Sequence, residues 1–222
     1  MNEVDVPVLD YKPRLDERNL AYRVTAASPE LLSRSRYWTP GAILNQQAEG
    51  ACVGFGVTAE AMASPVRNRV GDGNVMARGV YRRCLQIDEF EGERDEGTSV
   101  RAGMLVGRER GWWTGFRWAL NMNELRAALE EGPVVIGVEW REGMYEAPRG
   151  TLTPLGPVVG GHCILVTGYS PNYRNGGPFY RLRNSWGPSW GINGSAYITA
   201  PSLQRILFGS GGEAAVAIGR KA

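Results

Sequence analysis

Only one histidine and three cysteines occur in this chain of 222 residues. Three cysteines cannot complete a disulfide framework, which is typical of a protein that folds in a reducing compartment. One histidine and three scattered cysteines also give no cluster with the usual spacing of metal ligands. We therefore expect neither a metal ion nor another cofactor.

The chain also lacks a large net charge and long apolar runs. The 25 basic and 23 acidic residues leave a net charge of +2, and no long run of Lys or Arg occurs. Neither nucleic acid nor a membrane surface is therefore expected as a partner. No segment approaches the roughly 20 apolar residues that cross a bilayer, and the N-terminus lacks the regions of a secretory signal. These features predict a cytoplasmic protein, or a mature fragment whose signal has already been removed.

What is present favours one folded domain preceded by an arm. The length and a hydrophobic content of 43% suffice for one sizeable core, or for two lobes that share a cleft. Residues 1–40 are rich in Pro, Arg, Asp and Ser and show little periodicity. We interpret them as an N-terminal arm or a short pro-segment, and we place the folded domain at residues 41–222.

The front half of this domain carries the signals of helices. A helix is predicted to begin near Cys52, because apolar residues recur at helical spacing from Phe55 to Val66, and Pro65 should disturb or end it. Three further helices are predicted over residues 80–90, from a cap at Thr98 or Ser99 to Gly111, and over residues 123–133 with Asn121 or Asn123 as cap.

The back half is rich in β-branched and aromatic residues. Short runs of this kind, separated by Gly, Pro and Asn, predict strands over residues 134–140, 162–169, 179–184, 195–198 and 214–218. Helices in front and strands behind predict an α+β fold with two lobes. The helical lobe is expected over about residues 41–120, and the strand-rich lobe over about 121–222.

Two side chains in this pattern are candidates for chemistry. Cys52 lies at the start of a predicted helix, where free N–H groups and the helix dipole stabilise a thiolate, although a buried apolar cysteine is an equally ordinary interpretation. His162 follows Gly160-Gly161, so its ring should be approachable from one side. A lone histidine is more often structural, and Asn184 alone would be interpreted as a turn residue at a strand end.

A predicted hairpin connects His162 with Asn184. The two strands are joined by the turn-rich loop SPNYRNGGP, which favours antiparallel pairing. If Tyr169 pairs with Phe179, His162 and Asn184 share a face and lie within side-chain reach. A two-residue shift would pair them directly, whereas a one-residue slip would put them on opposite faces. An amide oxygen that accepts from one ring nitrogen would leave the other nitrogen facing a thiol.

Three segments resemble the papain family of cysteine peptidases. They are NQQAEGACVGFG, GGHCILVTGY and RNSWGPSWGINGSAYI, and they follow one another in the family's order of cysteine, histidine and asparagine. The resemblance spans roughly residues 40–200, and the stretches between the segments match loosely. It implies a papain-like two-lobed fold with an active cleft between the helical and the strand-rich lobe.

The resemblance implies a role for each matching residue. Cys52 corresponds to the nucleophile, His162 to the general base and acid, and Asn184 to the residue that orients the histidine. Gln46, six residues before Cys52, corresponds to the glutamine that donates to the oxyanion. Gln47 is the competing candidate, although its spacing is one residue short.

Three substrate-binding residues follow from the same comparison. Trp186 corresponds to an indole that shields the His–Asn hydrogen bond, and Trp190 to a residue on the leaving-group side; core packing is the alternative for both. EGTSVRAG is similar to a subsite segment of bacterial members, in which Gly97 would let a substrate backbone pair as an added strand. A helix-capping loop is the alternative for that segment.

Several departures point to bacterial or phage-encoded members of the family. Glu49 replaces a cysteine that is usual three residues before the nucleophile, and Val53 replaces an aromatic residue. His162 follows Cys52 by 110 residues, fewer than the roughly 130–150 that are usual. A phage-associated or released protein is therefore a further alternative for its localisation. Cys84 and Cys163 are expected to be core residues.

The function that this resemblance implies is a cysteine-type peptidase. It would hydrolyse amide bonds through a Cys-His-Asn triad and a thioester, with a polypeptide or peptide as its partner and substrate. One alternative is an amidase, deamidase or transglutaminase-type enzyme with the same triad. Another is a papain-fold binding module without activity. The sequence predicts no particular oligomeric state.

Overall fold

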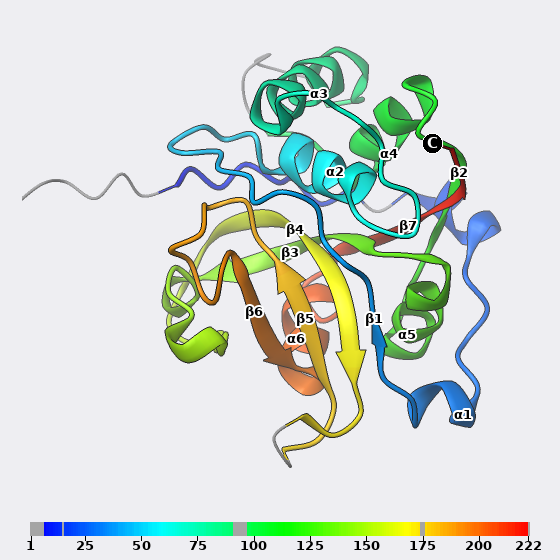
Figure 1. Cartoon of the computed structure of the whole chain (residues 1–222), viewed down its shortest axis with the longest axis vertical. Coiled ribbons are helices and arrows are strands. Elements are labelled where there is room, and N and C mark those ends of the chain that lie inside the picture. Colours follow the sequence, from blue (N-terminus) through cyan, green and yellow to red (C-terminus); the bar gives the residue numbers. More distant parts are fainter. Residues whose placement is uncertain (1–6, 15, 91–96, 174–175, 222) are drawn as a thin grey trace, which may run out of the picture.

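Helices pack on both faces of one antiparallel sheet (Figure 1). The structure is a computed structural model, and it describes residues 7–14, 16–90, 97–173 and 176–221. The helices are α1 (Pro29–Leu32), α2 (Cys52–Met62), α3 (Gly73–Ile87), α4 (Val100–Glu109), α5 (Met122–Glu131) and α6 (Ala200–Leu207). The strands are β1 (Arg36–Tyr37), β2 (Trp113–Trp118), β3 (Val134–Arg141), β4 (Val158–Ser170), β5 (Phe179–Arg183), β6 (Ser195–Thr199) and β7 (Glu213–Arg220).

The sheet has the strand order β2-β7-β3-β4-β5-β6, and β1 pairs with β4 beside this path. Side chains alternate along β3, β4 and β7, because successive residues of a strand point to opposite faces. Val135 and Leu165 pack against α2, α3 and α4, whereas Ile136 and Ile164 pack against α5 and α6. The sheet therefore separates two hydrophobic cores, and α2 is fixed on one of its faces.

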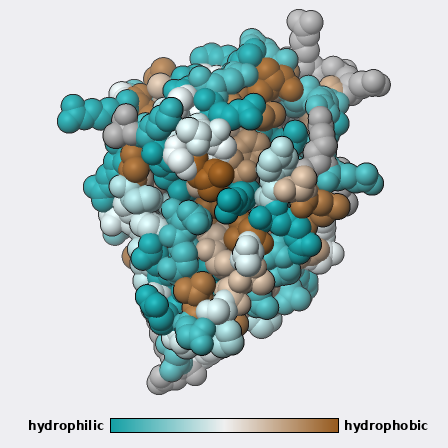
Figure 2. All heavy atoms as spheres, turned by 90° about the vertical axis from the view of Figure 1, so that its right-hand side faces the viewer, coloured by the Kyte–Doolittle hydropathy of each residue, from teal (hydrophilic) through white to brown (hydrophobic). Residues whose placement is uncertain are grey.

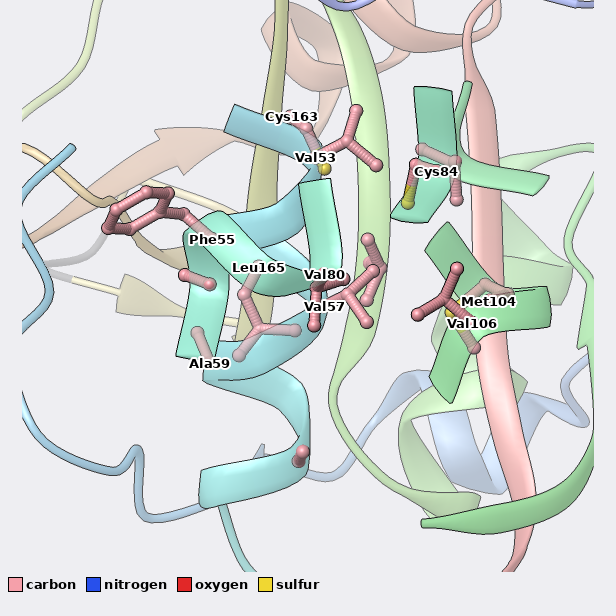
Figure 3. Close-up of a cluster of buried hydrophobic side chains, with 14 of the residues drawn as sticks. Val53, Phe55, Val57, Ala59, Val80, Cys84, Met104, Val106, Cys163 and Leu165 are labelled. Carbon is pink, nitrogen blue, oxygen red and sulfur yellow. The ribbon is translucent and has the colours of Figure 1, made fainter. Parts of the chain in front are cut away.

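The first core contains all three cysteines besides other residues of α2, α3 and α4, and Figure 3 labels two of them, Cys84 and Cys163. Cys84 and Cys163 are completely or almost completely buried there, as expected from the sequence. A Cβ atom added to Gly56 would lie 2.7 Å from the sulfur of Cys163. The helix that begins at Cys52 thus packs directly on β4, the strand that carries His162.

Helix caps explain where the helices begin. The side chain of Ser99 accepts a hydrogen bond from the N–H of Ala102, so Ser99 and not Thr98 caps α4. Asn121 caps α5 in the same way. The prediction for α3 was wrong at its start: the helix begins at Gly73, behind the cap Asp72, seven residues before the predicted start at Val80.

The hairpin of β4 and β5 contains a bulge that decides the position of His162. Near the loop, Tyr169 pairs with Tyr180 and not with Phe179, so the predicted register is wrong by one residue there. The register shifts between Val166 and Gly168, and beyond it Leu165 pairs with Arg183, as predicted. At the end that leads to His162 and Asn184 the two chains therefore have the expected register.

The segment of residues 7–12 runs between the helical layer and β4 (Figure 1). Its N–H at Tyr11 donates to the carbonyl of Gly161 at 3.1 Å. Two further bonds join it to the loop before α4: Lys12 donates to the carbonyl of Thr98 at 3.0 Å, and Thr98 donates to the carbonyl of Asp10 at 3.1 Å. These bonds make a parallel bridge between Tyr11 and Thr98.

The surface is mostly polar where it can be followed in the figures. On the face shown in Figure 2, hydrophilic residues surround separate small groups of hydrophobic ones. Among the helices that the structure describes, none has the length and apolar character needed to span a membrane.

Candidate active site

Cys52 is the first residue of α2, and its side chain is fully buried. No side chain caps this end of the helix, so the N–H groups of the first turn are not occupied by a capping oxygen. The backbone N–H groups of Cys163 and Asp10 also act on the thiol and favour its charged form. The thiol therefore lies between the start of α2, the residue after His162 and the N-terminal segment.

His162 and Asn184 are hydrogen-bonded to each other. The ring atom Nε2 of His162 lies 2.8 Å from Oδ1 of Asn184. The same oxygen accepts from the N–H of Ser185 at 2.8 Å, which identifies it as the amide oxygen. Because this oxygen can only accept, Nε2 carries the ring proton, and Nδ1 of the neutral ring is left with its lone pair. Nδ1 has no partner among the described residues.

Two indoles enclose this hydrogen bond. The rings of His162 and Trp186 have centroids 4.8 Å apart, and those of His162 and Trp140 have centroids 4.6 Å apart. The two indoles also meet each other edge to face at 5.2 Å. His162 is fully buried as a result, and the rings exclude water that would compete for the bond to Asn184.

Gln46 is buried next to Ser185, the neighbour of Asn184, and both ends of its amide group are hydrogen-bonded. Its Oε1 accepts from the hydroxyl of Ser185 at 2.7 Å, and its backbone N–H donates to the carbonyl of Ser185 at 2.8 Å. Its Nε2 donates to the carbonyls of Glu49 at 2.8 Å and of Val8 at 3.4 Å. Gln47 is exposed and has a positive φ of 54°. Gln46 is thus the glutamine whose amide donor meets a carbonyl in the cleft.

The N-terminal segment occupies this cleft from end to end. Val8 lies at the amide of Gln46, Asp10 at the thiol of Cys52, and Lys12 at Thr98. Gly97 has a φ of +59°, and a Cβ there would lie 2.2 Å from the carbonyl oxygen of Asp10. Glycine is needed at this position both for its backbone conformation and for the close approach of the segment.

A cavity of about 610 Å³ continues the cleft beyond Pro7. Pro7, Tyr145, Trp186 and Trp190 are among the residues that line it. Trp190 meets Trp186 edge to face at 6.1 Å and points its indole N–H at the carbonyl of Met144 at 3.4 Å. Trp190 therefore contributes to both the wall of the cavity and the core.

Burial sets the protonation of the thiol and of the imidazole. Loss of contact with water raises the pKa of Cys52 to about 11, despite the opposing effect of the backbone N–H groups. Burial also lowers the pKa of His162 to about 4, despite the opposing hydrogen bond to Asn184. Both groups are therefore neutral at pH 7 in this conformation.

The structure joins four of the seven predicted site residues: His162 contacts Asn184 and Trp186, and Ser185 connects Asn184 to Gln46. Cys52 lies at the backbone of Cys163, next to His162, and both Cys52 and Gly97 lie at Asp10. Trp190 lines the adjoining cavity. Sequence analysis did not single out Trp140 or Ser185. Ser185 stands between two of the predicted residues in the sequence and was identifiable there, whereas Trp140 comes from β3 and only the pairing of β3 with β4 brings it to His162. Among the described residues, no group of three His, Cys, Asp or Glu side chains can hold a metal ion.

Comparison with known sequences identifies relatives of the back half of the chain. The model of the papain family cysteine proteases matches residues 113–204. Cathepsin O of Mus musculus is 34% identical over 85 residues, which are 33% of this chain and 23% of that protein. The cysteine protease Amb a 11.0101 of Ambrosia artemisiifolia is 29% identical over 98 residues, 40% of this chain and 23% of that protein. The chain thus spans less than a quarter of the length of these relatives.

Comparison with solved structures covers the whole chain. Xylellain, a cysteine protease from Xylella fastidiosa, superposes with a TM-score of 0.68 at 14% identity, over 100% of this chain and 99% of that one. The stem bromelain precursor superposes with a TM-score of 0.59 at 15% identity, over 91% of this chain and 77% of that one. The predicted α+β fold with helices in the N-terminal part and strands in the C-terminal part is confirmed.

Proposed function

We propose, on the premise that this chain is a papain-like protein in its fold and in the sequence of its back half, that it hydrolyses peptide bonds. Cys52 would be the nucleophile, His162 the general base and acid, and Asn184 the residue that orients His162. The observation that carries the proposal is the hydrogen bond from Nε2 of His162 to Asn184. It leaves Nδ1 of the ring as an acceptor, and the residue after His162 lies at the thiol of Cys52.

The reaction that these groups support has two halves. Nδ1 of His162 takes the proton of Cys52, and the thiolate attacks the carbonyl carbon of the substrate. The tetrahedral oxyanion accepts from Nε2 of Gln46 and from the N–H of Cys52, and His162 then gives its proton to the leaving amine. Water, deprotonated by His162, hydrolyses the thioester and restores the free thiol.

We also propose that residues 7–12 keep the enzyme in a resting form. The segment passes the thiol and donates its N–H groups to carbonyls that line the cleft. It runs from the cavity at Trp190 towards Thr98. A substrate whose amine leaves on the side of Trp190 would run the other way. The segment thus crosses the cleft in the opposite chain direction to a substrate. Its peptide bonds are therefore poorly oriented for attack by the thiol that it covers.

Displacement of the segment would also change the charge of the pair. Water that enters the cleft removes the desolvation that holds Cys52 neutral. The dipole of α2 then favours the thiolate, and His162 takes up the proton that the thiol releases. The same displacement thus opens the cleft and activates the nucleophile.

Hydrolysis of a panel of fluorogenic peptides tests the proposed activity. The wild-type chain and its Tyr11→Ala variant, in which the covering segment is less firmly held, are assayed together with Cys52→Ala. Hydrolysis should occur with Tyr11→Ala and disappear in the double variant Tyr11→Ala/Cys52→Ala, while the double variant Tyr11→Ala/Cys84→Ala keeps it. Activity that survives the loss of Cys52 would contradict the assignment of the nucleophile.

A further inference from the structure

Cys163 is a second thiol beside the proposed nucleophile, and the proposed reaction does not use it. It follows His162 on β4 and is 1% exposed. Its backbone N–H lies at the thiol of Cys52. Its own sulfur packs on α2, because a Cβ atom added to Gly56 would lie 2.7 Å from Sγ of Cys163 (Figure 3). The backbone and the side chain of Cys163 thus both meet the helix that carries Cys52.

The two thiols lie along one face of α2. Cys52 and Gly56 are four residues apart in this helix, and residues with that spacing lie on the same face with about 5–6 Å between their Cβ positions. The sulfur of Cys163 therefore meets the face of α2 that carries Cys52, one turn further along. Gly56 adds no side chain between them. Rotation of each cysteine about its Cα–Cβ bond moves its sulfur along this face towards the other.

The two thiols differ in their reactivity towards reagents from solution. Burial raises the pKa of the Cys163 thiol well above its ordinary value, and the charge of Cys52 acts in the same direction. Cys163 therefore stays protonated and is a poor target for an oxidant, because the thiolate is the reactive form. Cys52 becomes a thiolate once residues 7–12 leave the cleft, as proposed above. An oxidant should thus attack Cys52 first.

The fate of an oxidised cysteine depends on whether a thiol is within reach. A peroxide converts a thiolate to a sulfenic acid, which condenses with a neighbouring thiol to a disulfide that reductants can open. Without such a neighbour, more peroxide converts the sulfenic acid to sulfinic and sulfonic acids, which thiols do not reduce. A thiol next to the nucleophile therefore decides whether its oxidation is reversible.

We propose, on the basis of the function proposed above, that Cys163 is a resolving cysteine, which captures the sulfenic acid of Cys52 as a disulfide when the open enzyme meets a peroxide. The disulfide blocks the nucleophile and protects it from further oxidation. Reduction by a dithiol restores both thiols and the activity.

The two steps use one molecule of hydrogen peroxide. In the first, the sulfur of Cys52 takes a hydroxyl group from the peroxide, the O–O bond breaks, and the second oxygen leaves as water with the proton of the thiol. In the second, the sulfur of Cys163 attacks the sulfur of Cys52, the S–S bond forms and the S–O bond breaks. The hydroxyl group leaves as water with the proton of Cys163. The two thiols are oxidised to one disulfide, and the peroxide is reduced to two molecules of water.

Mass spectrometry after peroxide treatment tests the proposal. The full-length Tyr11→Ala chain, in which the covering segment is less firmly held, is treated with hydrogen peroxide and digested without reduction. The chain should lose the mass of two hydrogen atoms, and a cross-linked pair of peptides should contain Cys52 and Cys163. Hydrolysis of a fluorogenic peptide should disappear with the cross-link and return after treatment with dithiothreitol.

Variants of the two buried cysteines identify the thiol that captures Cys52. Tyr11→Ala/Cys163→Ala should instead gain the mass of two or three oxygen atoms at Cys52 and stay inactive after dithiothreitol. Cys163→Ser, which keeps the size of the side chain, should behave in the same way and replaces the alanine variant if that variant does not fold. Cys84→Ala, at the other buried thiol, is the matched control and should keep both the cross-link and the recovery.

The possible outcomes separate this proposal from the peptidase function. Irreversible oxidation of Cys52 to the same extent with and without Cys163, in a chain that cleaves peptides, would overturn the role of Cys163 and leave the peptidase function intact. A loss of two hydrogen atoms that persists without Cys163 would also overturn it, because another group would then capture Cys52. If the cross-link formed and the reduced chain cleaved no peptide, the role of Cys163 would hold and the peptidase function would fail.

Discussion

The hydroxyl of Ser185 donates to Oε1 of Gln46 at 2.7 Å, and this bond turns the amide donor of Gln46 towards the cleft. Ser185 also donates its N–H to Oδ1 of Asn184 at 2.8 Å. One residue thus orients both the proposed oxyanion donor and the proposed partner of His162. The two halves of the site are thereby coupled through a single short segment of chain.

Removal of the amide of Gln46 tests its proposed role directly. We expect Gln46→Ala to lower kcat by about 10²–10³-fold, because one of two donors to the oxyanion is lost. The exposed neighbour provides the control, and Gln47→Ala should leave kcat within about twofold, since surface side chains away from the site contribute little. A larger effect at Gln47 than at Gln46 would reverse the assignment.

Ser185 is expected to act as a positioning residue. Ser185→Ala removes one hydrogen bond to Gln46 and should lower kcat about fivefold, with KM little changed, because a typical hydrogen bond contributes about 1 kcal/mol. Ser185→Thr keeps the hydroxyl and should restore most of the rate. A fall in stability without recovery by threonine would indicate that Ser185 acts on folding alone.

Tyr11 is expected to hold the N-terminal segment in the cleft. Tyr11→Ala removes the side chain that fills the pocket between Gly137 and Gly161. Alkylation of Cys52 by iodoacetamide, followed by mass spectrometry at neutral pH, should become at least about tenfold faster, since burial of a tyrosine contributes more than 1.4 kcal/mol. Tyr22→Ala, at a tyrosine that is 64% exposed, should have no such effect. Equal rates in the two variants would show that the segment does not shield the thiol.

Acid should destabilise the closed conformation through His162. The imidazole is the single one in the chain, and its pKa is about 4 in the structure against an ordinary value of 6.5. Between these values the unfolded chain binds a proton that the closed form does not bind, so stability is lost as the pH falls through this window. The loss approaches about 3 kcal/mol near pH 4.

Urea unfolding between pH 4 and pH 7 measures this effect. His162→Gln removes the group and should show a smaller loss of unfolding free energy over the same window, the remainder arising from carboxyl groups. If the two chains lost stability in parallel, the imidazole would not be buried in its neutral form.

The sequence predicted helices and strands correctly where contacts between neighbouring residues define them. Asn121 was one of the predicted helix caps, and its side-chain oxygen accepts a hydrogen bond from the N–H of Glu124, three residues later. The start of α3 was missed because Gly73 and Gly79 lower helix propensity. Packing outweighs that cost. The carbonyl of Ala77 on α3 lies 2.3 Å from where a Cβ of Gly54 on α2 would be, so the two helices touch at a glycine.

Apart from the hairpin that joins His162 to Asn184, contacts between distant parts of the chain could not be predicted. Strand β2 was not predicted, because Gly115 and Arg117 interrupt the alternation of apolar and polar residues that indicates a strand. It forms because it pairs with β7, a strand about 100 residues later in the chain. The course of residues 7–12 is a similar case. A short segment without periodicity carries no signal of the cleft that it occupies, and three backbone hydrogen bonds to Gly161 and Thr98 define its path.

The bulge between Val166 and Gly168 separates the loop end of the hairpin from its functional end. A strand with one residue to spare can absorb a change of length near residues 171–178 by moving this irregularity along β4. Natural or engineered insertions in that loop should therefore leave His162 within reach of the amide of Asn184. The outer tip of the hairpin is thus a place where new sequence can be grafted onto the molecule without redesign of its chemistry.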